Sequence, residues 1–190
     1  YRDSGILNIF DSAFVWDKVA VNNNYPELSA SPLKRLLVLL ARVDSPTFEA
    51  NMTAVLDIEA WARYSVYEAL TQSTHADNVH NWRIYYDPWR GKLVPMVWDP
   101  MGWRDTMRGK KFQSEIRASF LMEKLFVHDE FLRIRGRILR EFFESGKDGE
   151  FMNFVKRKID VMKQEVLTDP LLKPASPAQV SDAMQRLQTH

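Results

Sequence analysis

Apolar residues recur at helical spacing over much of the chain. The spacing predicts one helix beginning at Ser31-Pro32 and another beginning at Ser45-Pro46, because serine is a favoured N-cap and proline suits the first helical turn. Asp57 is expected to cap a third helix, IEAWARYSVYEALTQ, whose apolar stripe is wide. We therefore predict that this third helix is well buried.

One segment changes from helical to alternating periodicity. Apolar positions alternate in NWRIYYD (81–87) and in LVPMVWD (93–99), and PWRGK between them supplies proline and glycine for a turn. The pattern predicts a β-hairpin, and Pro95 gives its second strand a free edge. Three tryptophans are expected on buried faces, whereas Trp89 in the turn is expected to be exposed. The three are Trp61, Trp82 and Trp98.

Helical spacing returns after the hairpin, so the predicted fold class is mainly α with one β-hairpin. A proline-broken connector precedes a short last helix, VSDAMQRLQ. Residues 1–24 mix aromatic and β-branched residues, which suits a short strand or a buried loop. We treat residues 1–190 as a single domain or fragment. The helices predicted between the hairpin and the connector span about 115–127, 130–144 and 150–167.

Composition excludes several classes of function. The chain has 190 residues, enough for a core, and its 26 basic and 25 acidic side chains give no basic field for nucleic acid. It has no cysteine, which excludes disulfides, thiolate zinc sites and a cysteine nucleophile. No apolar run approaches the roughly 18 residues of a membrane span. No signal peptide is visible, but the first residue is Tyr1 rather than Met, so we expect an excised or processed chain.

Polar side chains gather at the two ends of the predicted hairpin. Asp77, Asn78, His80 and Asn81 precede its first strand, and Asp99 follows its second. Because both ends of an antiparallel pair meet on one side, Asp77 and Asn81 are expected near Asp99. Carboxylate and amide oxygens suit Mg²⁺, and an acid in a polar loop can accept a hydroxyl proton. Protein kinases use this layout, although His-Arg-Asp and Asp-Phe-Gly are absent. The alternative is a capped helix end followed by plain turns.

The stretch from Leu56 to Trp103 resembles the core of the CotH family, the spore-coat-type secreted protein kinases. LMEKLFVHDEFLRIRGRILREFF (121–143) is similar to a later segment of that family. The resemblance covers roughly 33–170 and leaves 171–190 as a connector and C-terminal helix. The elements that match in order are Asp57, Asp77, His80-Asn81, Tyr85-Tyr86, Gly91-Lys92, Pro95 and Trp98-Asp99.

The resemblance implies an atypical kinase-like C-lobe that phosphorylates protein serine or threonine hydroxyls with Mg²⁺ and ATP. Asp77 would be the catalytic-loop acid, Asn81 and Asp99 would be the ligands of the metal and its nucleotide, and Trp98 would be a buried support. For His80 a structural role is favoured over that of a general base. The implied partners are a nucleotide and a protein substrate. The implied location is extracellular, on a cell surface or on a spore coat.

Two departures from the family pattern weigh against activity in this chain alone. Met101 stands where the family usually has a second acid. A glycine-rich nucleotide loop and the lysine–glutamate pair of an N-lobe are missing, so that lobe is expected before Tyr1 or has been lost. We therefore expect the isolated chain to be inactive. The alternative function is a non-catalytic spore-coat, surface or adhesion scaffold with a degenerate kinase-like fold.

Overall fold

A computed structural model describes residues 8–17, 19, 30–41, 45–99, 113–168 and 176–189. The chain divides into two compact units, and each is described separately below. The predicted site residues that precede and follow the hairpin all belong to the first unit. The expectation of a single domain or fragment over 1–190 stays a prediction. The first unit comprises residues 1–103 and 111–138, and the second comprises 104–110 and 139–190.

The helices predicted before the hairpin are confirmed. They are α2 (Ser31–Ala41), α3 (Ser45–Val55) and α4 (Ile58–Thr71). Asp57 caps α4, since its Oδ1 accepts the Ala60 N–H at 3.2 Å. Eight residues of α4 are buried, as its wide apolar stripe predicts.

The described part of the N-terminal region has no strand and is only partly buried. Two short 3₁₀ turns, η2 (Ile9–Asp11) and η3 (Ala13–Val15), follow one another there. Ile9 and Phe10 of η2 are buried, whereas Phe14 and Val19 are exposed.

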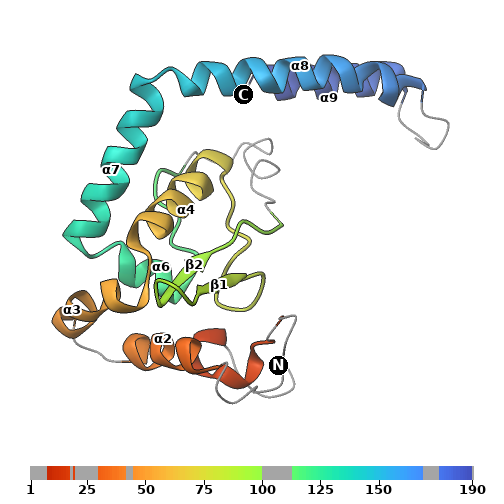
Figure 1. Cartoon of the computed structure of the whole chain (residues 1–190). Coiled ribbons are helices and arrows are strands. Elements are labelled where there is room, and N and C mark those ends of the chain that lie inside the picture. Colours follow the sequence, from red (N-terminus) through yellow and green to blue (C-terminus); the bar gives the residue numbers. More distant parts are fainter. Residues whose placement is uncertain are drawn as a thin grey trace. The chain divides into compact units, whose positions relative to one another are not determined.

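The predicted hairpin is confirmed, with shorter strands. β1 (Ile84–Asp87) pairs antiparallel with β2 (Lys92–Pro95), and Tyr85 lies opposite Val94. Among the described residues the sheet has these two strands only. The Leu93 carbonyl accepts hydrogen bonds from the Asp57 N–H and the Trp61 indole, at 3.2 and 2.9 Å, and so joins β2 to α4. Figure 1 shows α4 beside the hairpin.

The burial predicted for Trp98 is wrong, whereas that of Trp61 and Trp82 is confirmed. Trp98 is 52% exposed, while Trp61 and Trp82 are 0% and 5% exposed. Trp98 lies three residues beyond the end of β2, and its neighbours Met96 and Val97 are 51% and 54% exposed as well. The Arg83 guanidinium lies 4.8 Å from the centre of the Trp98 ring and covers part of it. Trp89 is 96% exposed, as predicted for the turn.

An aromatic cluster forms the core beneath the hairpin. The Trp82 ring centre lies 5.5 Å from that of Trp61, 5.6 Å from that of Tyr64 and 5.9 Å from that of Phe10. Such large, closely packed rings contribute both buried area and favourable edge and offset contacts. The cluster therefore fixes the chain immediately before β1, where the predicted site residues lie.

The helix predicted at 115–127 is wrong in its first turn. The structure has α6 at Phe120–Leu125, and Ser119 caps it by accepting the Met122 N–H at 3.3 Å. The backbone N–H and carbonyl of Gln113 instead form hydrogen bonds with the side chain of Gln72, and the carbonyl of Ser114 accepts one from Arg135. These tertiary hydrogen bonds hold the chain just before the predicted helix start, and local propensity alone does not reveal them.

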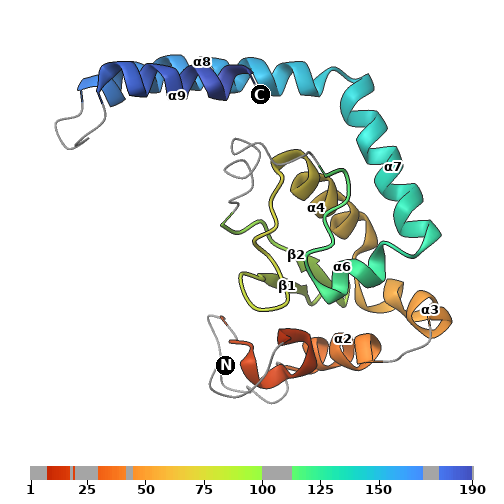
Figure 2. The ribbon, with the colours of Figure 1, turned by 180° about the vertical axis from the view of Figure 1, so that it is seen from behind.

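The remaining helices agree with the sequence pattern. α7 (Asp129–Glu144) is followed by Ser145 and Gly146, whose φ of +72° is a conformation that favours glycine. In the second unit, α8 (Lys147–Thr168) and α9 (Pro177–Thr189) lie side by side, and α9 is longer than predicted (Figure 2). Of the helices in the described part of the chain, none has the length and apolar character needed to cross a membrane.

Candidate active site

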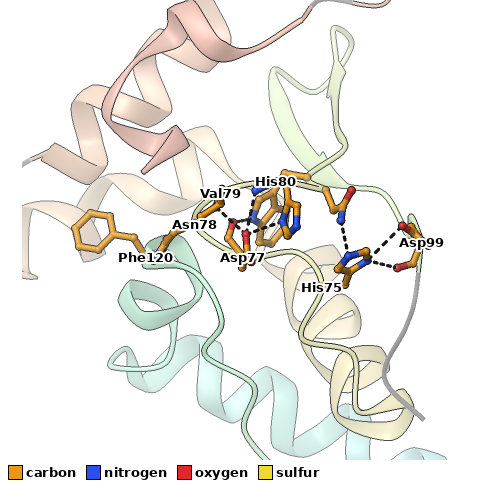
Figure 3. Close-up of polar contacts among 9 residues, drawn as sticks. His75, Asp77, Asn78, Val79, His80, Asp99 and Phe120 are labelled. Carbon is orange, nitrogen blue, oxygen red and sulfur yellow. Dashed lines mark hydrogen bonds and ion pairs between the residues drawn. The ribbon is translucent and has the colours of Figure 1, made fainter. Parts of the chain in front are cut away.

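Asp77 forms the turn that leads into the hairpin. Its Oδ1 accepts the backbone N–H groups of Val79 and His80 at 2.7 and 2.9 Å, and the His80 Nδ1 lies 2.9 Å from the same oxygen (Figure 3). The Trp82 indole donates to the Asp77 carbonyl at 2.9 Å. Asp77 thus stabilises a turn, as the alternative of a capped helix end followed by plain turns expected. Through Trp82, the aromatic core holds that turn in place. Its other carboxylate oxygen, Oδ2, makes no hydrogen bond with a described residue.

His75 bridges the two residues predicted to bind the metal. Its Nε2 lies 2.9 Å from the Asn81 amide nitrogen, and its Nδ1 lies 3.1 Å from the Asp99 carbonyl and 3.3 Å from the Asp99 Oδ2. An amide nitrogen can only donate, so Nε2 accepts and Nδ1 carries the proton that is donated to Asp99; this tautomer is assigned from the network. One imidazole therefore orients side chains from both ends of the hairpin.

The backbone is strained at the same two positions. Asn81 has a φ of +65° and Asp99 a φ of +46°, and both therefore lie in the left-handed region. Asn and Asp enter this region more readily than other non-glycine residues, but the conformation still carries a cost and tends to occur at functional sites. In the described part of the chain, Gln72 is the one other non-glycine residue with positive φ.

The predicted approach of the two hairpin ends is observed through a pair of histidines. His80 contacts Asp77, and the His80 and His75 rings lie edge to face with centres 5.2 Å apart. His75 in turn contacts Asn81 and Asp99. The arrangement brings the three predicted site residues into one polar cluster, while their catalytic and ligand roles stay predictions.

The donor atoms in this cluster fit Mg²⁺ that is shared with phosphate. Asn81 Oδ1 and Asp99 Oδ1 are hard oxygen donors, and neither makes a hydrogen bond with a described residue. Within the described ranges, no group of three or more His, Asp or Glu side chains is placed to hold a metal. Mg²⁺ in nucleotide sites commonly takes one or two protein carboxylates together with water and phosphate oxygens. Met101 lies outside the described residues.

His75 is the site residue that the sequence prediction missed, although a signal was present. His75-Ala76-Asp77 has the His-x-Asp spacing of the kinase His-Arg-Asp motif, with alanine in the position of the arginine. Asn81 follows Asp77 by four positions rather than the five of that motif. Because Ala76 replaces the arginine, the complete His-Arg-Asp motif is absent and His75 does not stand out in the sequence.

Asn78 joins the site loop to two other elements of the first unit. Its Oδ1 accepts the Phe120 N–H at 2.6 Å at the start of α6 (Figure 3). Its carbonyl accepts the Ile9 N–H at 2.8 Å. Both the side chain and the backbone of Asn78 are engaged in holding the loop. These contacts assign Asn78 a structural role beside the cluster.

Glu68 is an ionisable residue of α4 whose carboxylate is buried without a partner. It is 1% exposed, and within the described residues neither oxygen has a hydrogen-bond partner of normal geometry. Burial raises the pKa of Glu68 to about 8, and the neighbouring Tyr64 side chain opposes part of this rise. Glu68 is therefore protonated at neutral pH.

Comparison with known families agrees with this geometry. A family model described as CotH kinase protein matches residues 11–187, which is most of the chain. The chain belongs to the CotH kinase family. The match includes both ends of the hairpin and the whole polar cluster, so a kinase-like function in general follows from membership of the CotH kinase family. Neither the curated proteins nor the solved structures include a match to this chain.

Proposed function

We propose that this chain carries the metal-binding and proton-accepting residues of a protein kinase that transfers the γ-phosphoryl group of ATP to serine or threonine hydroxyls. The observation that carries the proposal is the bridge formed by His75 between Asn81 and Asp99. Two oxygen donors from opposite ends of a hairpin are oriented by one imidazole, as expected where ligand geometry matters. Membership of the CotH kinase family supports the same class of reaction.

Asn81 and Asp99 would hold Mg²⁺ through Oδ1 of each side chain. The bound metal supplies charge neutralisation at the phosphate oxygens, which together with positioning is the main requirement of phosphoryl transfer. His75 keeps both side chains in place before the nucleotide arrives, because it contacts each of them. A preorganised pair loses less conformational entropy on binding than two free side chains.

Asp77 would accept the proton of the acceptor hydroxyl. In that step the hydroxyl oxygen forms a bond to the γ-phosphorus, the bond from that phosphorus to the β–γ bridging oxygen breaks, and ADP leaves. The turn holds Asp77 through Oδ1 and leaves Oδ2 without a hydrogen bond to a described residue. About a third of the Asp77 side chain is exposed, so an acceptor can approach it.

The partners implied by this chemistry are a nucleotide and a protein with an acceptor hydroxyl. The family resemblance further suggests that the protein acts outside the cell, on a cell surface or on a spore coat. Immunolabelling of intact cells or spores would locate it, and a label confined to the cell interior would contradict that location.

Phosphoryl transfer by the complete natural protein tests the proposal. The acceptor is myelin basic protein with labelled ATP and Mg²⁺, and the variants are Asp99→Asn and Asp77→Asn. Asn suits left-handed backbone, so Asp99→Asn removes a charge with little backbone cost. We expect each variant to lose at least about a hundredfold in rate. The matched control is Asp87→Asn at the other end of the hairpin, where an amide oxygen can still accept the turn hydrogen bonds from Trp89 and Arg90. Equal rates for all four proteins would refute the proposal.

A scaffold without catalysis is the second candidate. Met101 in place of the family's second acid is the observation that favours it. A scaffold of this kind would fold normally, show no phosphoryl transfer and gain no thermal stability from ATP with Mg²⁺. Stabilisation of the wild-type protein by ATP and Mg²⁺, absent in Asp99→Asn, would exclude it.

A further inference from the structure

Gln72 ends α4 in a conformation that its side chain does not favour. Its φ is +54° and its ψ is 32°, which is left-handed backbone at the helix C-cap. Glycine and asparagine are the usual residues there, and other side chains carry a conformational cost. A glutamine in this position therefore suggests that its side chain has a task that glycine or asparagine cannot perform.

The Gln72 side chain forms a two-point clamp on a distant part of the chain. Its Nε2 donates to the Gln113 carbonyl at 2.9 Å, and its Oε1 accepts the Gln113 N–H at 2.8 Å. The second amide hydrogen donates to the Ala69 carbonyl of the same helix. Both polar atoms of the Gln72 amide thus form hydrogen bonds, and all of their partners are backbone groups.

Gln113 is the first residue of a segment, 113–119, that is joined to the site loop (72–78). Residues 113–119 start at Gln72 and lead into Phe120, whose N–H donates to Asn78. The 72–78 and 113–120 stretches are therefore joined at corresponding ends and run in the same direction, as can be followed in Figure 2. A third attachment comes from Arg135 of α7, which donates to the Ser114 carbonyl. Hydrogen bonds at its two ends therefore tie the 113–119 segment to the ends of the loop that carries His75 and Asp77.

We propose that Gln72 is a positioning residue for the protein acceptor, because it fixes one end of the 113–119 segment, which leads into Phe120 at the hydrogen bond to Asn78, the residue next to Asp77. This inference rests on the proposed kinase function and includes an acceptor that approaches Asp77 along that segment. Gln72 touches neither the candidate metal ligands nor Asp77 in the described contacts. Its loss should therefore weaken acceptor binding and leave nucleotide binding unchanged.

Gln72→Asn removes the hydrogen bonds to Gln113 but keeps the cap of α4. Asn is at ease in left-handed backbone, so the cap is kept, but its side chain is one methylene too short to reach Gln113. Gln72→Glu is the graded variant, because one oxygen can still accept the Gln113 N–H while the donor to its carbonyl is lost. Asn51→Ala is the matched control: it removes another amide-to-backbone hydrogen bond, from Asn51 to the Thr47 carbonyl, within α3.

The experiment measures steady-state phosphorylation of myelin basic protein by the complete natural protein, with hydrogen exchange of the 113–119 peptide as a second readout. For Gln72→Asn we expect the KM for the acceptor to rise roughly threefold to tenfold, with kcat and the KM for ATP unchanged and faster exchange in the peptide. Gln72→Glu should fall between Gln72→Asn and wild type. Asn51→Ala should match wild type in all of these quantities.

Two different failures are distinguishable. An active wild type that depends on Asp99, together with unchanged acceptor KM in Gln72→Asn, overturns the role of Gln72 and leaves the kinase proposal standing. Equal losses in kcat and in ATP affinity would also overturn it, because they would mean a general structural effect. Absence of transfer by the wild type overturns both proposals.

Discussion

The buried carboxyl of Glu68 makes the stability of the fold depend on pH. Burial raises the pKa of Glu68 from 4.5 to about 8. Below about pH 4.5 the group is protonated in the folded and unfolded states alike, so it adds no pH dependence. Between these two values the unfolded chain loses the proton while the folded protein keeps it. The free energy of unfolding therefore falls as pH rises through this window, and the penalty is constant above about pH 8.

The size of the effect follows from the shift of the Glu68 pKa. Each unit is equivalent to about 1.4 kcal/mol, so the difference between 4.5 and 8 gives a total of about 5 kcal/mol. Glu68 is 1% exposed, so water does little to screen this penalty. Such a loss is a large part of the about 5–15 kcal/mol that stabilises a typical domain.

Urea unfolding of wild type and Glu68→Gln between pH 5 and pH 9 measures the effect. The buried amide of the variant changes the free energy of unfolding by an amount that does not vary with pH. We therefore compare the difference in unfolding free energy between variant and wild type at pH 5 with the same difference at pH 9. We expect Glu68→Gln to gain several kcal/mol relative to wild type on going from pH 5 to pH 9. Glu123→Gln on α6 is the control, because Glu123 is exposed and its replacement should leave a curve parallel to wild type. Parallel curves for Glu68→Gln as well would refute the reasoning.

Three further substitutions probe the site loop and its support. His75→Ala should weaken Mg²⁺-dependent ATP binding about 10–100-fold, because it removes the group that orients Asn81 and Asp99. Calorimetry measures this affinity, and an unchanged value would contradict the role of the His75 bridge. Asn78→Ala should lower the free energy of unfolding by about 1–3 kcal/mol in urea, because the N–H at the start of α6 loses its acceptor, and a loss near zero would mean that water replaces it. Asp57→Ala should cost about 1 kcal/mol by thermal unfolding through loss of the α4 cap, and an unchanged midpoint would count against that cap.

Local sequence signals were sufficient for most of the secondary structure. Asp57 and the Ser-Pro pairs mark helix starts through capping chemistry that acts within a few residues. The change to alternating periodicity located the hairpin for the same reason. These features depend on neighbours in sequence, so a single chain displays them directly.

Tertiary contacts decided the features that were missed. The stretch 115–119 is not helical, and tertiary contacts hold the two residues just before it, Gln113 through Gln72 and Ser114 through Arg135. Trp98 is exposed because it lies beyond the end of β2, where Met96 and Val97 are also about half exposed.

The candidate site was predictable in part. Antiparallel geometry alone predicted that Asp77 and Asn81 would approach Asp99 across the hairpin. The bridge by His75 was not predicted, because it depends on the ring lying between two side chains that are distant from one another in sequence.

Calorimetric binding of ATP with Mg²⁺ to the complete natural protein would show whether the polar cluster holds a metal–nucleotide complex. We expect binding by wild type and by Asp87→Asn, and its loss in Asp99→Asn, since Asp99 is the carboxylate that would hold the metal while Asp87 lies in the hairpin turn. All three proteins should show the same far-ultraviolet circular dichroism. Binding that survives in Asp99→Asn, or absence of binding by folded wild type, would contradict a metal–nucleotide site at His75, Asn81 and Asp99.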